Sequence, residues 1–149
     1  MKVLLLNGSP RKNGCTYTAL NVVADALKAE GIDAEVFQAG DPDMENVKAA
    51  AAKLKDSDAL VVGSPVYWAS PSGQIIEFMD RLASVAGKDM LYKPAAAVAS
   101  ARRAGTTATL DVLTKYFSYH QMPVVSSCYW SMVHGNCPAD VLQDREGLQ

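Results

Sequence analysis

The feature of this sequence that most limits its fold is an alternation of short apolar runs with longer amphipathic stretches. The apolar runs are continuous, which is typical of strands covered on both faces. The stretches between them repeat apolar residues at helical spacing, as Leu20, Val23 and Leu27 do. Strands and helices that alternate in this way form a parallel sheet with helices on both faces. We therefore predict an α/β fold.

The expected elements can be placed along the chain from these runs and stripes. The first helix is expected over Thr16–Glu30, and three further helices are marked by their apolar stripes. The stripes are Val47, Ala51 and Leu54, then Ile75, Met79 and Leu82, then Leu110, Leu113 and Phe117. The five predicted strands are Lys2–Asn7, Ala34–Gln38, Ala59–Ser64, Pro94–Ser100 and Pro123–Tyr129.

Five parallel strands with right-handed crossovers fit the doubly wound order 2-1-3-4-5. This order reverses between the first and third strands, and ligands of such sheets bind beyond the carboxyl ends of the strands at the reversal. The loops after the first, third and fourth strands are therefore the expected site.

The 149 residues have the length of one domain. A fifth helix should follow the fifth strand, on the same face as the first helix. Only residues 139–149 remain for it, which is short for such a helix. Either the natural chain continues past Gln149 or a partner covers that face, and we favour a C-terminal helix that is missing from this sequence.

Charge and composition argue against several classes of partner. Lys and Arg number 14 against 16 Asp and Glu, a formal charge of −2, whereas a nucleic-acid module normally carries a basic face. No apolar run approaches the ~20 residues that span a bilayer. The cysteines Cys15, Cys128 and Cys137 have unrelated spacings, which favours a reducing compartment over a disulfide framework. We expect a cytoplasmic protein that binds neither nucleic acid nor membrane.

The loop after the first strand has the chemistry of a phosphate site. Residues 7–16 read Asn-Gly-Ser-Pro-Arg-Lys-Asn-Gly-Cys-Thr, which combines glycines, hydroxyls and two cations with the start of a helix. The unpaired N–H groups of a helix start favour anions, and glycines let backbone donors approach phosphate oxygens. The alternative is an ordinary strand-to-helix turn with solvated cations.

Other phosphate-binding devices do not match this loop. A nucleotide-binding loop needs two glycines with four residues between them, followed by Lys and then Ser or Thr. Here Gly8 and Gly14 have five residues between them, and Cys15 and Thr16 follow. The dinucleotide fingerprint Gly-x-Gly-x-x-Gly is absent. A cysteine phosphatase would have its Cys at the loop start and an Arg six residues later, whereas Asn21 stands six residues after Cys15. We interpret Cys15 as a small residue that donates its backbone N–H.

The two later loops add an apolar wall and a second set of polar groups. Residues 63–73 place Tyr67 and Trp68 between prolines, which suits stacking against a planar ring, although these aromatics could also pack in the core or against another subunit. Residues 101–107 offer backbone donors, hydroxyls and two arginines. They could hold the polar edge of a ring or a second nucleotide's phosphate, or form an exposed basic turn.

Three motifs in this order resemble a known family. They are Asn-Gly-Ser-Pro-Arg-Lys-Asn-Gly at 7–14, Gly-Ser-Pro-Val-Tyr-Trp at 63–68 with Phe-Met-Asp-Arg at 78–81, and Lys-Pro at 93–94 leading to Arg-Arg-Ala-Gly at 102–105. With them the chain resembles the NAD(P)H-dependent FMN reductase family of flavodoxin-like proteins over nearly its whole length. The resemblance implies one flavodoxin-like domain over residues 1–149, with FMN as cofactor and NAD(P)H as electron donor.

The resemblance also implies which residues bind FMN. The phosphate would lie on the first loop and the isoalloxazine ring against the second, with the third loop near the other side of the ring. The residues of the first loop are Ser9, Arg11, Asn13, Gly14, Cys15 and Thr16. Those of the other two loops are Pro65, Val66, Tyr67 and Trp68, and Ala101, Arg102 and Gly105.

Members of this family usually form dimers or tetramers whose subunits complete one another's flavin sites, so a homodimer or homotetramer is implied. Cys15 stands where relatives commonly have Asn, which removes one side-chain contact. Relatives of the iron–sulfur branch carry four clustered cysteines, whereas the three here are scattered, and we expect no cluster or other metal.

These observations predict an oxidoreductase in which the flavin performs the redox chemistry and no catalytic side chain is needed. NAD(P)H would give a hydride to FMN, and a quinone, free flavin, azo or nitro compound would then take the electrons in a ping-pong sequence. The main alternative is a non-enzymatic flavodoxin-type electron carrier, although carriers tend to be strongly acidic and this chain is not. A second alternative is a regulatory protein that has kept the fold and lost the flavin.

Overall fold

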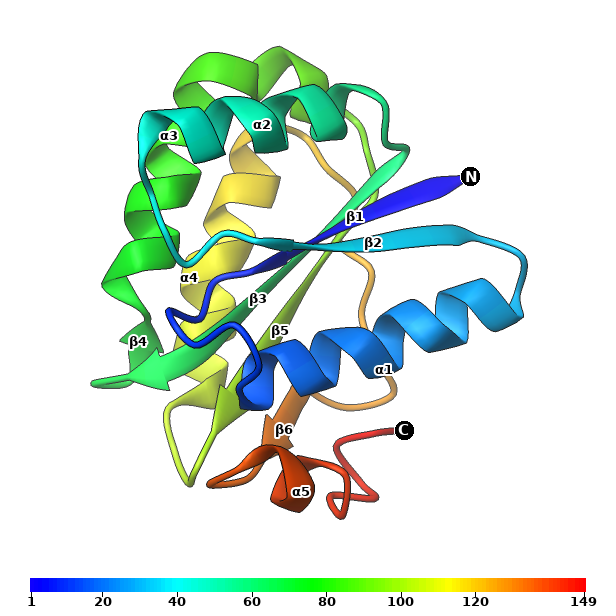
Figure 1. The fold of residues 1–149 in the computed structure, drawn as a ribbon, viewed down its shortest axis with the longest axis vertical. Coiled ribbons are helices and arrows are strands. Elements are labelled where there is room, and N and C mark those ends of the chain that lie inside the picture. The colour runs from blue at the N-terminus through cyan, green and yellow to red at the C-terminus, as the bar shows by residue number, and fades with distance from the viewer.

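The strands of the computed structural model, which describes all residues 1–149, form one twisted parallel sheet with helices on both faces (Figure 1). The strand order is β2-β1-β3-β5-β6, and the short β4 pairs antiparallel with the end of β3. Apart from β4, this is the predicted order, with its reversal between β1 and β3. The strands are β1 (Lys2–Asn7), β2 (Asp33–Gln38), β3 (Ala59–Tyr67), β4 (Ser70–Pro71), β5 (Ala95–Ala101) and β6 (Met132–His134).

The helices divide between the two faces of the sheet (Figure 1). α2, α3 and α4 cover one face, and α1 and the short α5 cover the other. Leu4 and Leu6 of β1 point to the first group, whereas Val3 and Leu5 point to the second. Both faces of β1 are therefore buried, which explains its continuous apolar sequence. The helices are α1 (Cys15–Ala29), α2 (Met44–Lys55), α3 (Gly73–Met90), α4 (Thr106–Tyr119) and α5 (Pro138–Val141).

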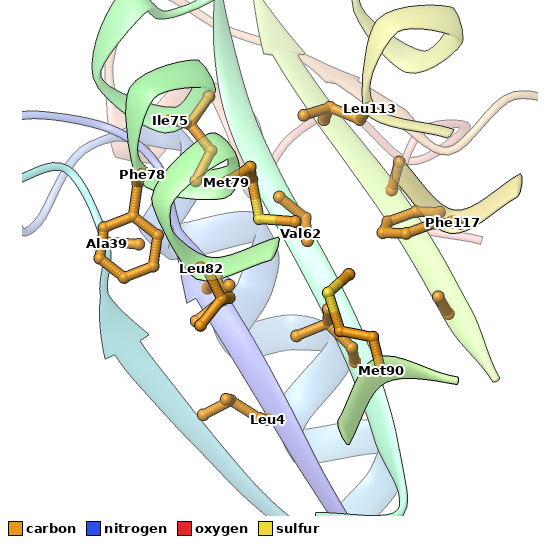
Figure 2. Close-up of a cluster of buried hydrophobic side chains, with 14 of the residues drawn as sticks. Leu4, Ala39, Val62, Ile75, Phe78, Met79, Leu82, Met90, Leu113 and Phe117 are labelled. Atoms are coloured by element: carbon orange, nitrogen blue, oxygen red, sulfur yellow. The ribbon is translucent and has the colours of Figure 1, made fainter. Parts of the chain in front are cut away.

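The larger core lies beneath α3. Ile75, Met79 and Leu82 form the predicted stripe on this helix and are fully buried. Figure 2 shows the Met79 side chain directed toward Val62 of β3. Ile75 and Leu82 belong to the same buried cluster, which also includes Leu4 of β1. The stripe is buried because a helical repeat of three and four residues keeps its members on one face.

The prediction for the fifth strand was wrong. The edge strand is β6 at Met132–His134, and the predicted Pro123–Tyr129 contributes only an isolated bridge between Val124 and Ala95. The Val125 N–H donates to the Ala95 carbonyl, and the next bond runs from the Ala99 N–H to the Ser131 carbonyl. Between these two hydrogen bonds the edge segment, residues 125–131, advances by six residues, whereas β5 advances by only four, from Ala95 to Ala99. The surplus residues leave the ladder, and continuous pairing resumes only at β6.

β3 extends past the predicted end at Ser64 as far as Tyr67. The extension arises because the chain turns back at Trp68 and Ala69 and pairs with itself through β4. No apolar periodicity marks this hairpin, since it projects beyond the sheet.

The face that carries α1 is incompletely covered. α5 is only four residues long, and beside α1 lies an apolar groove of about 510 Å³. Its walls come from α1, β5, β6, the edge segment before β6 and the end of the chain. This is the face on which the sequence predicts a fifth helix. None of the helices combines the length and apolar character that crossing a bilayer requires.

Phe78→Ala tests the core beneath α3. Phe78 is fully buried and packs at a ring-centroid distance of 6.4 Å from Phe37. Removing the ring leaves a cavity, so we expect the free energy of unfolding in urea to fall by about 3–5 kcal/mol. Val85→Ala on the same helix is the control, since Val85 is 50% exposed and its loss should change stability by less than about 0.5 kcal/mol. Equal losses in the two variants would contradict this packing.

Candidate functional site

The carboxyl ends of β1, β3 and β5 lie side by side at one edge of the sheet. In the ladders Asn7 pairs with Gly63, and Pro65 pairs with Ser100. The three loops that the sequence singles out leave the sheet at these points (Figure 1). Strand register therefore places them within reach of a single ligand.

A buried and a half-buried amide side chain, those of Asn7 and Gln38, hold the first loop in shape. Asn7, fully buried, accepts a hydrogen bond from the Ser9 N–H (3.2 Å) and donates one to Gln38 Oε1 (2.7 Å). Gln38 in turn donates to the Ser9 carbonyl at 2.6 Å. The Arg11 N–H donates to the Ser9 hydroxyl at 3.1 Å. The loop is thus ordered from beneath, which leaves its outer surface free for a ligand.

The loop ends at a helix start that is open to an anion. Gly14 is the N-cap of α1 and makes no side-chain capping bond. The N–H groups of Cys15, Thr16 and Tyr17 have no acceptor within the helix, because α1 begins at Cys15. They present the positive end of the helix dipole beside the Arg11 side chain. This arrangement fits a phosphate group.

The loop can approach β3 only because Gly8 has no side chain. The Gly8 N–H donates to the Gly63 carbonyl at 2.8 Å. A Cβ atom on Gly8 would lie 2.7 Å from that oxygen and 2.6 Å from the Ile75 side chain. Any other residue would push the loop away from the sheet.

The second loop is a tight hairpin with strained backbone at its tip. Trp68 and Ala69 have φ values of 55° and 56°, the positive values that two-residue hairpin turns of type I′ require. Such conformations cost residues other than glycine about 1–3 kcal/mol each, and they concentrate at functional sites. The Trp68 side chain is 100% exposed, with the exposed Tyr67 beside it. The hairpin therefore presents a rigid aromatic surface to the surroundings.

The third loop packs directly against this hairpin. Gly105, at φ 96°, is the N-cap of α4, and a Cβ atom there would lie 2.8 Å from both Ala69 Cα and Val66 Cγ1. A hydrogen bond of 2.7 Å between the buried hydroxyls of Thr16 and Ser100 links the first loop to the end of β5. The structure thus brings all three loops together.

Sequence reasoning missed the serine that joins the first loop to the hairpin. The Ser72 hydroxyl donates to the Gly8 carbonyl at 2.7 Å and accepts the Ile75 N–H at 3.3 Å. The Ser72 N–H donates to the Ser64 hydroxyl at 3.0 Å. Its place before the Ile75 stripe indicates a helix N-cap, but its contact with Gly8 has no signal in the sequence.

Four cations lie around this edge without acidic partners. Arg11, Lys12, Arg102 and Arg103 are exposed and belong to none of the ion pairs. Unpaired cations raise the local concentration of anionic ligands.

The Cys15 thiol has a different character. Burial raises its pKa above the ordinary value, and the neighbouring Cys137 and Asp140 raise it further. The raised pKa lowers the share of Cys15 thiolate at neutral pH, so no catalytic role in flavin chemistry is assigned to this thiol. No group of three or more His, Cys, Asp or Glu side chains is placed to hold a metal ion.

All the predicted cofactor residues lie on these three loops, and they differ in exposure. Ser9, Thr16 and Ala101 are buried, Gly14, Cys15, Pro65, Val66 and Gly105 are half-buried, and Arg11, Asn13, Tyr67, Trp68 and Arg102 are exposed.

A sequence model of the NADPH-dependent FMN reductase family matches residues 1–136. The chain belongs to this family. An iron-sulfur flavoprotein of Methanocaldococcus jannaschii is 29% identical over 175 aligned residues, which cover 100% of this chain and 91% of that protein. An NADPH azoreductase of Bacillus sp. strain OY1-2 is 30% identical over 108 residues, 68% of this chain and 59% of that protein.

Solved structures confirm the flavodoxin-like fold. A flavodoxin from the domain Archaea has a TM-score of 0.73 at 18% identity and covers 99% of this chain and 94% of its own. The apo form of an NADH:FMN oxidoreductase has a TM-score of 0.72 at 20% identity, with 99% and 86% covered.

Family membership makes the protein an oxidoreductase that uses FMN as cofactor and NAD(P)H as electron donor. The residues present fit this cofactor, because an open helix start with a cation suits its phosphate and the aromatic hairpin suits its planar ring.

Arg11→Ala tests the phosphate end of the site. Loss of a hydrogen bond to a charged group costs about 1.5–3 kcal/mol, so we expect the Kd for FMN to rise about ten- to a hundredfold. FMN fluorescence titration measures this change. Lys55→Ala is the matched control, because it removes an exposed cation from the C-terminal end of α2, which lies near the amino end of β3 and away from the three loops. A Kd raised equally in both variants would show that only overall charge matters.

Proposed function

We propose that this FMN oxidoreductase passes electrons from NAD(P)H to a small planar acceptor, such as a quinone, free flavin, azo or nitro compound, in a ping-pong sequence. The observation that carries the proposal is that the exposed Tyr67-Trp68 hairpin and the open N-terminus of α1 lie at the same end of the sheet, where β1, β3 and β5 end. When bound there, FMN would supply the redox chemistry by accepting two electrons from the nicotinamide and releasing them to the acceptor.

The chain's own groups bind and orient in this proposal. The N–H groups at the start of α1 and the Arg11 side chain would hold the cofactor phosphate. The hairpin would hold the ring. Gly105 keeps the third loop in contact with the hairpin, and backbone donors of that loop would hold the polar edge of the ring. Fixed donors of this kind stabilise negative charge that develops on reduction.

The exposed cations support a nucleotide donor and argue against an electron carrier. Arg102 and Arg103 lie on the third loop without acidic partners. Cations at this edge attract anionic nicotinamide nucleotides, whereas a carrier that docks on basic proteins needs an acidic surface there. The azoreductase relative supports an azo compound among the acceptors.

Ping-pong turnover has a direct kinetic signature. With one surface for both substrates, NAD(P)H must leave before the acceptor binds. We expect double-reciprocal plots at several acceptor concentrations to give parallel lines, measured by loss of NADPH absorbance with a quinone as acceptor. Intersecting lines would contradict the sequence of steps, and a protein that consumes no NADPH with any of these acceptors would contradict the function itself.

We further propose that the protein is a homodimer or homotetramer in which a neighbouring subunit covers the Tyr67-Trp68 hairpin. A tryptophan that is 100% exposed on a strained turn gains most of its stabilisation from burial against a partner. A cytoplasmic location fits the three unpaired cysteines.

Trp68→Ala tests this assembly. Loss of an interface hot spot costs about 2 kcal/mol or more, which weakens association about thirtyfold. Light scattering after size-exclusion chromatography should therefore show dissociation at a protein concentration where the unchanged protein is assembled. Tyr119→Ala removes another aromatic, 84% exposed, from the far end of α4 and should leave the assembly intact. A monomeric unchanged protein would overturn the proposal.

A further inference from the structure

We propose that Cys15 and Cys137 form an oxidisable thiol pair at the phosphate end of the cofactor site, and that their disulfide weakens FMN binding. The effect on FMN rests on the proposed placement of the phosphate on the first loop.

The two cysteines lie at the adjoining starts of two packed helices. Cys15 is the first residue of α1, and Cys137 is the N-cap of α5, which packs on α1. The Cys15 thiol donates to the Gly135 carbonyl at 3.7 Å. Gly135 is only two residues from Cys137. The buried Val141 of α5 belongs to the same apolar cluster as α1, which holds the two helices together.

The segment that carries Cys137 is held in place by the sheet. The Gly135 N–H donates to the Ala101 carbonyl at the end of β5 (3.0 Å). The Asp140 carboxylate accepts the N–H groups of Asn136 (2.8 Å) and Cys137 (3.1 Å). These bonds lower the pKa of Asp140, so that it stays charged and keeps the turn closed at neutral pH. The proximity of Cys137 to α1 therefore follows from the fold and not from a chance position of the chain end.

The third cysteine supplies an internal contrast. Cys137 is one of the groups that raise the pKa of the Cys15 thiol, as expected for neighbouring sulfurs, whereas Cys128 is not. Cys128 lies on the exposed segment between Val125 and Ser131 that leaves the sheet ladder. It is therefore the matched control for a cysteine without a partner.

Oxidation requires only a small disulfide such as oxidised glutathione. The exposed Cys137, as thiolate, attacks one glutathione sulfur, which forms a mixed disulfide and releases one glutathione thiolate. The Cys15 thiol then loses its proton, and the released glutathione thiolate can accept it. The Cys15 sulfur attacks the Cys137 sulfur, which forms the protein disulfide and releases the second glutathione thiolate. Two protein S–H bonds are replaced by one S–S bond, and the oxidant gains both electrons and both protons as two glutathione thiols. Transient disulfides of this kind occur in cytosolic redox sensing.

The disulfide changes the helix start that would hold the phosphate. To reach Cys137, the Cys15 sulfur must leave the Gly135 carbonyl, and the first turn of α1 becomes tied to the residues before α5. The free N–H groups of this turn are those that would contact the phosphate. By linkage, a disulfide that weakens FMN binding by a given factor is itself disfavoured by bound FMN by the same factor.

The first experiment maps the disulfide without FMN. The full chain, freed of FMN, is incubated with oxidised glutathione, alkylated and digested without reduction, and the peptides are analysed by mass spectrometry. We expect the Cys15 and Cys137 peptides to be joined in the unchanged protein and in Cys128→Ser, and no intramolecular disulfide in Cys137→Ser. Mixed glutathione adducts only, or joining to Cys128, would overturn the thiol pair.

The second experiment measures FMN affinity by fluorescence titration of oxidised and reduced Cys128→Ser protein. We expect the oxidised form to bind FMN about tenfold more weakly, about 1.4 kcal/mol, and dithiothreitol to restore the affinity. Cys137→Ser given the same treatment should show no loss. Equal affinities in the two forms would overturn the coupling to FMN. If the reduced protein bound no FMN, the proposed function and the coupling would fail together, and the mapping would still decide the thiol pair.

Discussion

The close approach of β1 and β3 at their carboxyl ends is the constraint on which the rest of the site depends. Gly8 donates to the Gly63 carbonyl at a distance that leaves no room for a Cβ atom. Because the loop stays at the sheet, the first turn of α1 lies against β3 and β5, where Thr16 is next to Gly63 and bonds to Ser100. The Ser72 hydroxyl, bonded to the Gly8 carbonyl, ties the start of α3 to the same point. One pair of glycines thus sets the relative position of three elements.

In this site, different residues hold the loops in place and present groups to a ligand. The residues that hold the loops, among them Asn7, Thr16 and Ser72, are buried, and no buried side-chain nitrogen or oxygen lacks a partner. Among the groups expected to touch ligands, Trp68 is exposed and strained, and Arg11 is exposed and charged. This division lets the edge of the sheet present an unpaired cation and a fully exposed tryptophan without loss of order.

Much of the fold was predictable because its signals are local. The Ile75 stripe and the continuous apolar run of β1 follow directly from helical and two-faced burial, and the strand order is confirmed. The fifth strand was misplaced because Pro123–Tyr129 has strand composition, yet the chain takes six residues from Val125 to Ser131 while β5 takes four from Ala95 to Ala99, so continuous pairing is lost. The hairpin after Tyr67 was missed because it has only two paired residues on each side, too few to show a strand periodicity in the sequence. The three loops were found because glycine, hydroxyl and cationic residues cluster there, but their supporting residues were not.

The sequence by itself determined the class of fold, the loops that form the site and the family to which the chain belongs. These depend on residue types at short spacing, which a chain carries whether or not it is folded. Only the tertiary structure decided that Gly105 packs on the hairpin, that Ser72 bonds to Gly8 and that Cys15 lies against the segment before Cys137. The physical reason is separation along the chain. The Cys15 thiol and the Gly135 carbonyl are 120 residues apart in sequence, and only the register of the parallel strands brings them together.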